Sequence, residues 1–143
     1  MEKPMRKFSI FLLIICFACL SSFQGVFPER VSLIKLLANP DEYHGKKIMV
    51  TGFLHLELED NSLYFSREHA NYLSTENAVW VNLGKNIRVE DKEGSQTSID
   101  ALNRKYVMII GKFNKDRTGH MGLFSGEIED IERIFELKKL YHD

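Results

Sequence analysis

One segment, residues 46–59, constrains the fold more than any other part of the chain. Its side chains alternate strictly, because one side carries only apolar residues and a glycine while the other becomes polar toward the C-terminal end. The apolar side comprises Ile48, Val50, Gly52, Leu54, Leu56 and Leu58. A strand of this length exceeds the usual five or six residues, and an interior glycine lets a strand coil or bulge. The pattern predicts a long, coiled strand that serves two sheets.

Shorter segments around this strand predict a mostly β domain with short helices. We expect helices at residues 31–38, 67–73 and 98–103, strands at residues 62–66, 78–83 and 106–114, and loops at residues 41–45 and 84–97. The last element, from Gly126 to about Phe135, is ambiguous. A helix is one interpretation of this segment. The other, which we favour, is a strand that would close a barrel.

The first 25 residues have the layout of an export signal. Lys3, Arg6 and Lys7 precede an apolar run that ends at Leu20. A membrane-spanning helix needs about 20 apolar residues, more than this run provides. The sequence therefore predicts a signal peptide at residues 1–25, a domain at residues 26–137 and a tail at residues 138–143. The expected location is the periplasm or the outer membrane of a bacterium.

Both cysteines of the chain lie within the apolar run. Cys16-Phe-Ala-Cys19 resembles a bacterial lipobox, in which a small residue precedes the acylated cysteine. Two outcomes remain open: a lipid anchor on Cys19, and cleavage of the signal at a later position. The domain after Leu20 contains no cysteine, so no disulfide holds it together.

The charge balance opposes nucleic-acid binding by bulk attraction. The chain has 19 basic and 20 acidic side chains, a formal net charge of −1. Loss of the basic signal peptide makes the exported domain more acidic. A phosphate backbone selects clustered positive charge, so we do not expect a nucleic-acid partner.

The sequence predicts neither a metal site nor an enzyme. The five histidines show no paired spacing of the kind that binds zinc. His55, Glu57 and Glu59 share one strand face, which we expect to be solvated. Ser125, in Phe-Ser-Gly, has no nucleophile-elbow context, which leaves a hydrolase as the weakest alternative. No cofactor or small-molecule substrate is identifiable.

Three runs resemble exported bacterial OB-fold envelope proteins that are related to the nucleic-acid anticodon-binding type. The run from Tyr43 to Gly52, YHGKKIMVTG, resembles their first strand. The runs GKFN, residues 111–114, and GHMGLFSG, residues 119–126, resemble their last two strands and the connection between them. The resemblance covers about residues 31–134 and implies a five-stranded OB-fold-like barrel. It informs the fold more than the function, because one fold carries many unrelated functions.

Ligands of OB-folds meet the second and third strands and the adjacent loops. The corresponding candidates here are Tyr64, Trp80, Lys115, Arg117 and His120. Tyr64 lies on the opposite side of its strand from Phe65, so we expect Tyr64 at the surface. For Phe65 and Trp80 we favour a place in the core.

Two classes of function remain open. We favour a non-catalytic envelope module that acts in protein interaction or envelope structure, with an envelope protein as partner and a lipid anchor as an open possibility. The alternative is a domain that binds an oligosaccharide or single-stranded nucleic acid.

Overall fold

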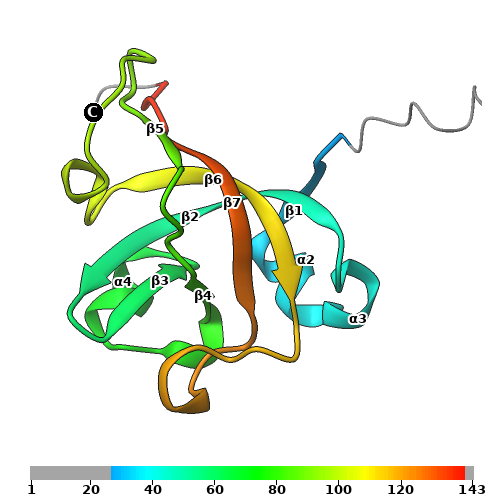
Figure 1. Ribbon diagram of the computed structural model, residues 1–143. Helices are drawn as coiled ribbons and strands as arrows, with labels where there is room; N and C mark the ends of the chain where they lie inside the picture. The colour runs from blue at the N-terminus through cyan, green and yellow to red at the C-terminus, as the bar shows by residue number, and fades with distance from the viewer. Residues whose placement is uncertain (1–26, 141–143) are drawn as a thin grey trace, which may run out of the picture.

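A computed structural model describes residues 27–140. The expected signal peptide, including Cys19, lies outside the described residues, as does the end of the expected tail. Strands make up most of the regular structure, as predicted (Figure 1). They are β1 (Glu29–Ser32), β2 (Lys47–Glu57), β3 (Asp60–Tyr64), β4 (Ala78–Val81), β5 (Arg88–Glu90), β6 (Tyr106–Asn114) and β7 (Glu127–Glu136).

The helices are short. They are α2 (Leu33–Ala38), α3 (Pro40–Tyr43), α4 (Arg67–Asn71) and the 3-10 turns η1 (Thr75–Asn77), η2 (Asp100–Leu102) and η3 (His120–Gly122). Within residues 27–140, no helix is both long and apolar enough to cross a membrane.

Five strands form a closed ring (Figure 1). β2 pairs antiparallel with β3 and with β6, β3 pairs with β4, and β6 pairs with β7. A short parallel contact between β4 and β7 closes the ring, with Trp80 opposite Glu127 and Val81 opposite Ile128. β1 and β5 lie outside the ring, parallel to β2 and β7 respectively.

β2 is the long strand that the alternating pattern predicts. Residues 47–53 pair with β6, and residues 53–57 pair with β3. Gly52 lies beside this crossover, where a Cβ atom would be 2.7 Å from both Leu63 Cγ and the carbonyl oxygen of Tyr64. The glycine is therefore required by the close approach of β3 as well as by the course of the strand.

The N-terminal segment differs from the prediction in two details. The first helix begins at Leu33 rather than Val31, because Val31 and Ser32 pair with β2 and the Ser32 side chain caps the helix. The chain then enters α3 instead of the expected turn at residues 41–45. Pro40 fits the first position of this helix because that position needs no backbone N–H donor.

Two later segments were predicted with different success. The expected loop at residues 84–97 contains β5, whose Val89 and Glu90 are buried and whose Glu90 carboxylate accepts hydrogen bonds from Arg133. The last element is a strand, which confirms the preferred interpretation. The register between β6 and β7 shifts at Gly111, as in a β-bulge.

The core lies inside the ring, with a second apolar cluster beside it. The main cluster includes Ile48, Val50 and Leu54 of β2, and Leu56 is partly buried against it. Leu58 follows β2 and is 99% exposed, because the chain turns there toward β3. The smaller cluster comprises Phe53, Tyr64, Ala70, Ala78 and Phe124, with Trp80 packed against it. This cluster covers the outer face of β3, so both faces of that strand are buried.

Candidate functional site

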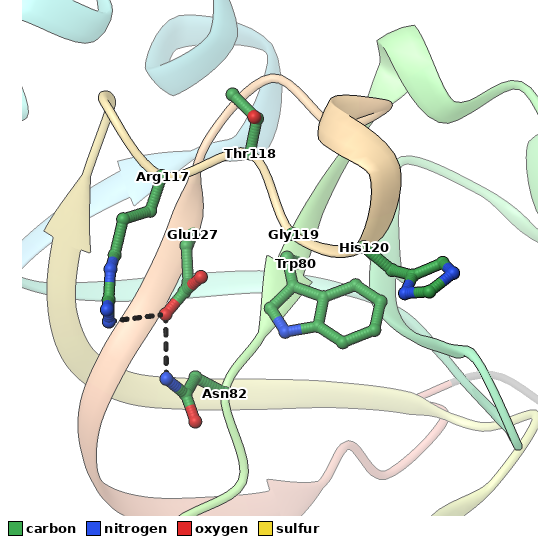
Figure 2. A pocket seen from close by; sticks show the side chains of 7 residues that line it. All are labelled: Trp80, Asn82, Arg117, Thr118, Gly119, His120 and Glu127. Carbon is green, nitrogen blue, oxygen red and sulfur yellow. Dashed lines mark hydrogen bonds and ion pairs between the residues drawn. The ribbon is translucent and has the colours of Figure 1, made fainter.

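A pocket of about 460 Å³ lies where the loop between β6 and β7 folds over β4 (Figure 2). Its lining combines one half-buried aromatic ring with several hydrogen-bonding side chains. The lining residues are Trp80, Asn82, Arg117, Thr118, Gly119, His120 and Glu127.

The contact that closes the strand ring supplies the base of this pocket. Trp80 and Asn82 are two residues apart at β4, so their side chains point to the same face. Glu127 is the register partner of Trp80 across the parallel β4–β7 contact. Strand pairing thus places an indole, an amide and a carboxylate next to one another.

The carboxylate of Glu127 is almost buried, with 6% of the residue exposed. Asn82 Nδ2 donates a hydrogen bond to Glu127 Oε1 at 2.7 Å, and Arg117 Nη1 lies 3.5 Å from the same oxygen (Figure 2). Arg117 Nη1 is also 3.4 Å from Glu129 Oε2. A buried carboxylate needs such donors to offset its lost hydration. The contacts hold all three polar groups in place and balance the charge of Arg117.

Trp80 is held by the loop that covers it. The backbone of Gly119 lies against the indole, and the ring of Phe124 has its centroid 5.4 Å from that of Trp80. Gly119 adopts φ 64° and ψ −156°, a conformation that is accessible essentially only to glycine. The indole is therefore fixed before any ligand arrives.

His120 connects this loop to the turn between β2 and β3. Its Nε2 atom lies 3.6 Å from Glu59 Oε2, in the turn between β2 and β3. Figure 2 shows His120 on the side of Trp80 away from Arg117. Two loops that are distant in sequence thus flank the pocket.

Three of the five predicted ligand residues come together here, namely Trp80, Arg117 and His120. Lys115 does not line the pocket. Its ammonium lies 3.0 Å from Asp116 and 3.3 Å from Asp41, and these two carboxylates raise the pKa of Lys115. It acts as a local ion-pair partner.

The prediction that Tyr64 lies at the surface is wrong. Its side chain is fully buried because α4 and the β6–β7 loop cover the outer face of β3. Its hydroxyl donates to Asp60 Oδ2 at 3.1 Å, and burial together with the Asp60 charge raises the pKa of Tyr64 to about 12. The expectation of a buried Phe65 is also wrong, since this residue is 42% exposed. Trp80, which we also expected in the core, is half-buried: it packs against the smaller cluster and lines the pocket.

The structure also corrects the expectation for His55, whose ring packs edge-on against that of Tyr64. Instead of lying on a solvated face, His55 is 3% exposed, with Nδ1 2.9 Å from Asp60 Oδ2 and Nε2 3.2 Å from Glu57 Oε1. Among residues 27–140, no group of three or more histidine, cysteine, aspartate or glutamate side chains is arranged to hold a metal ion.

Sequence reasoning missed Asn82 and Glu127. A signal for Asn82 was available, because a polar residue two positions after Trp80 shares its face. Glu127 carried no such signal, since only the parallel pairing of distant segments brings it beside Trp80.

Comparisons with protein-family models, curated proteins and solved structures find no match to this chain. The class of site therefore follows from its geometry. A fixed, half-buried indole beside an amide, a carboxylate and a guanidinium makes a pocket that is suited to binding.

Proposed function

We propose that this protein is an exported bacterial OB-fold module that binds a ligand without catalysis. The strand ring supports the fold assignment, because it closes in the order β2-β3-β4-β7-β6 and an OB-fold is a five-stranded Greek-key barrel. Trp80 then lies on the third strand, and Arg117 and His120 lie in the connection between the fourth and fifth. OB-folds bind their ligands in this region.

The ligand class that fits the pocket best is a neutral oligosaccharide. An indole face offers a flat apolar surface for a sugar ring, and sugar hydroxyls both donate and accept hydrogen bonds. The pocket provides both kinds of group, since Asn82 and Arg117 donate and Glu127 accepts. The observation that carries this proposal is the fixed Trp80 indole beside the hydrogen-bonded pair of Asn82 and Glu127.

The surrounding charges favour a sugar over single-stranded nucleic acid. Arg117 faces both Glu127 and Glu129, and His120 faces Glu59. A phosphate backbone would meet these carboxylates and gain little from cations that are already paired. A neutral ligand carries no such penalty.

The contacts of Glu127 with Asn82 and Arg117 also support a non-catalytic role. General acid–base catalysis needs a carboxyl group that exchanges a proton with the ligand. Among the lining residues that the structure describes, Glu127 is the one carboxylate, and its Oε1 atom is already occupied by hydrogen bonds from the Asn82 amide and the Arg117 guanidinium. Such a group orients a ligand.

The intrinsic fluorescence of the protein tests this proposal directly, because Trp80 is the only tryptophan of the chain. We expect saturable changes in emission when chitotriose, cellotriose or maltotriose is added, and none with a dT12 oligonucleotide at 150 mM salt. Asn82→Ala weakens saccharide binding, whereas Asn86→Ala, outside this pocket, leaves it unchanged. If none of the three sugars alters the emission, oligosaccharide binding at Trp80 loses its support.

A separate observation favours protein interaction as a second function. Leu58 is 99% exposed and Met121 is 79% exposed, on the two loops that the His120–Glu59 contact joins. Apolar side chains grouped at a surface commonly mark interaction sites. Crosslinking in the native envelope would then capture one defined protein, and Leu58→Glu with Met121→Glu would abolish capture without changing the saccharide titration.

A further inference from the structure

A second pocket, of about 640 Å³, lies among α4, the segment after η2 and the end of β7. It shares no lining residue with the pocket at Trp80. Its lining is dominated by positive charge. The cationic residues are Arg67, Lys92, Arg104, Lys105, Lys138 and Lys139.

This concentration of charge is a local feature. The chain as a whole has almost equal numbers of acidic and basic side chains, yet Glu136 is the one carboxylate among the described lining residues. It lies 2.9 Å from the Lys105 ammonium. Like charges that gather in one concave site raise its positive potential, which attracts anions.

Hydrogen bonds to β2 fix the backbone at Arg104, one of these cationic residues. Asn103 accepts a hydrogen bond from Leu56 N at 2.9 Å and donates one to Leu56 O at 3.0 Å, so its side chain binds to β2 as a neighbouring strand would. Arg104 follows with φ 61°, an uncommon conformation for a residue other than glycine. Its backbone N–H donates to Leu54 O at 2.8 Å. The unusual φ is thus fixed by contacts on both sides.

The buried ring of Phe53 lies beneath the two arginines, and Tyr106, which packs against it, lines the pocket. The guanidinium carbons of Arg67 and Arg104 lie 5.7 Å and 5.9 Å from the centroid of the Phe53 ring. The ring of Tyr106 packs edge-on against Phe53 and is 43% exposed. Arg104 Nη2 also donates to Asn71 Oδ1 at 2.7 Å. These contacts restrict the two arginines, and the partly exposed ring of Tyr106 lines the pocket beside them.

We propose that this pocket binds a small ligand that carries phosphate groups. Guanidinium and ammonium groups are the side chains that bind phosphate best, and Arg67, Arg104 and Lys138 supply both kinds in one place. The exposed face of Tyr106 suits an organic group attached to the phosphate. The volume fits a compact ligand, whereas a polynucleotide needs a charged track with several stacking surfaces. This site goes beyond the proposed saccharide binding and does not depend on it.

Calorimetric titration of the purified full-length chain tests the proposal. With inorganic pyrophosphate, inorganic phosphate and sulfate as probes, we expect affinity to fall in that order and to decrease as salt is raised. Arg67→Gln combined with Lys138→Gln changes two exposed residues of the pocket and should weaken pyrophosphate binding at least about tenfold, as loss of charge-assisted contacts implies. Lys46→Gln combined with Lys85→Gln removes the same charge outside the pocket and should leave the affinity within about twofold.

The source of the phosphate is distinguished by a second measurement. If the natural ligand is a lipid headgroup, the protein sediments with phosphatidylglycerol vesicles but not with phosphatidylcholine vesicles, and pyrophosphate competes. If it is a free phosphate ester, pyrophosphate binds and neither vesicle does. The proposal is overturned if neither pyrophosphate nor anionic vesicles bind, if the two double variants lose affinity equally, or if dT12 binds this pocket more tightly than pyrophosphate.

Discussion

A Cβ atom on Gly119 would lie 2.7 Å from Cγ of Trp80, so the loop can cover the indole only because this residue has no side chain. We expect Gly119→Ala to lower the free energy of unfolding by about 1–3 kcal/mol, since it adds backbone strain to the steric clash. Urea unfolding measures the loss. Gly84→Ala is the matched control, because nothing lies within 4 Å of a Cβ at that position, and an equal loss there would contradict the prediction.

Gly52→Val should destabilise the protein by more than the about 1 kcal/mol that is typical of a point substitution. The added side chain would meet both Leu63 and the backbone oxygen of Tyr64, and the backbone cannot move aside without breaking the β2–β3 pairing. Denaturant midpoints of the two proteins test this prediction. Equal midpoints would mean that β3 does not approach β2 as closely as described.

The raised pKa of Tyr64 makes stability depend on alkaline pH. An unfolded tyrosine releases its proton near pH 10, whereas buried Tyr64 does so at about 12. Because folding favours the neutral phenol, this contribution is fully present below pH 10 and is lost as the pH rises through 12. Urea unfolding at pH 9 and pH 11 should therefore show a smaller loss of stability in Tyr64→Phe than in the unaltered protein. Tyr72→Phe, at a site that is 84% exposed, should behave as the unaltered protein does.

Both the oxygen and the nitrogen of the Asn103 side-chain amide should contribute to the stability of the fold. Asn103→Asp replaces the donor to Leu56 O with an oxygen, which removes one hydrogen bond and sets a charge against a carbonyl. We expect a loss of about 1–3 kcal/mol in the free energy of unfolding. Asn39→Asp is the control, since its amide donates at an exposed position, to Lys35 O at 3.3 Å. An equal loss with both substitutions would show that the hydrogen bonds between Asn103 and Leu56 add no stability beyond that of an exposed amide contact.

Local sequence patterns predicted the elements that depend least on distant partners. The alternation through β2 and the β-forming run of β6 identified both strands, because each keeps one apolar face toward the core. β5 was not predicted, because it is short, begins with the polar residue Arg88 and is stabilised by pairing with β7. Its position is decided by tertiary contacts that no local pattern records.

Burial was misjudged where a second layer covers a strand. The period of two correctly separated Tyr64 from Phe65, but α4 and Phe124 bury the face that we expected to be solvated. His55 was misjudged because its ring is buried against Tyr64 and bound by Asp60 and Glu57. The candidate site was predicted in part: Trp80, Arg117 and His120 were named, whereas Glu127 depended on a parallel pairing between distant segments.

The pairing of Trp80 with Glu127 also has a kinetic consequence. These residues face each other across the contact that closes the ring, so the pocket exists only after β4 and β7, which are distant in the sequence, have met. Contacts between distant segments form slowly, because their loop-closure entropy is lost before they stabilise the chain. A chain in which β4 and β7 have not yet paired therefore has no complete pocket at Trp80. The ligand that we propose for Trp80 should therefore prolong the lifetime of the folded state and leave the rate of refolding unchanged.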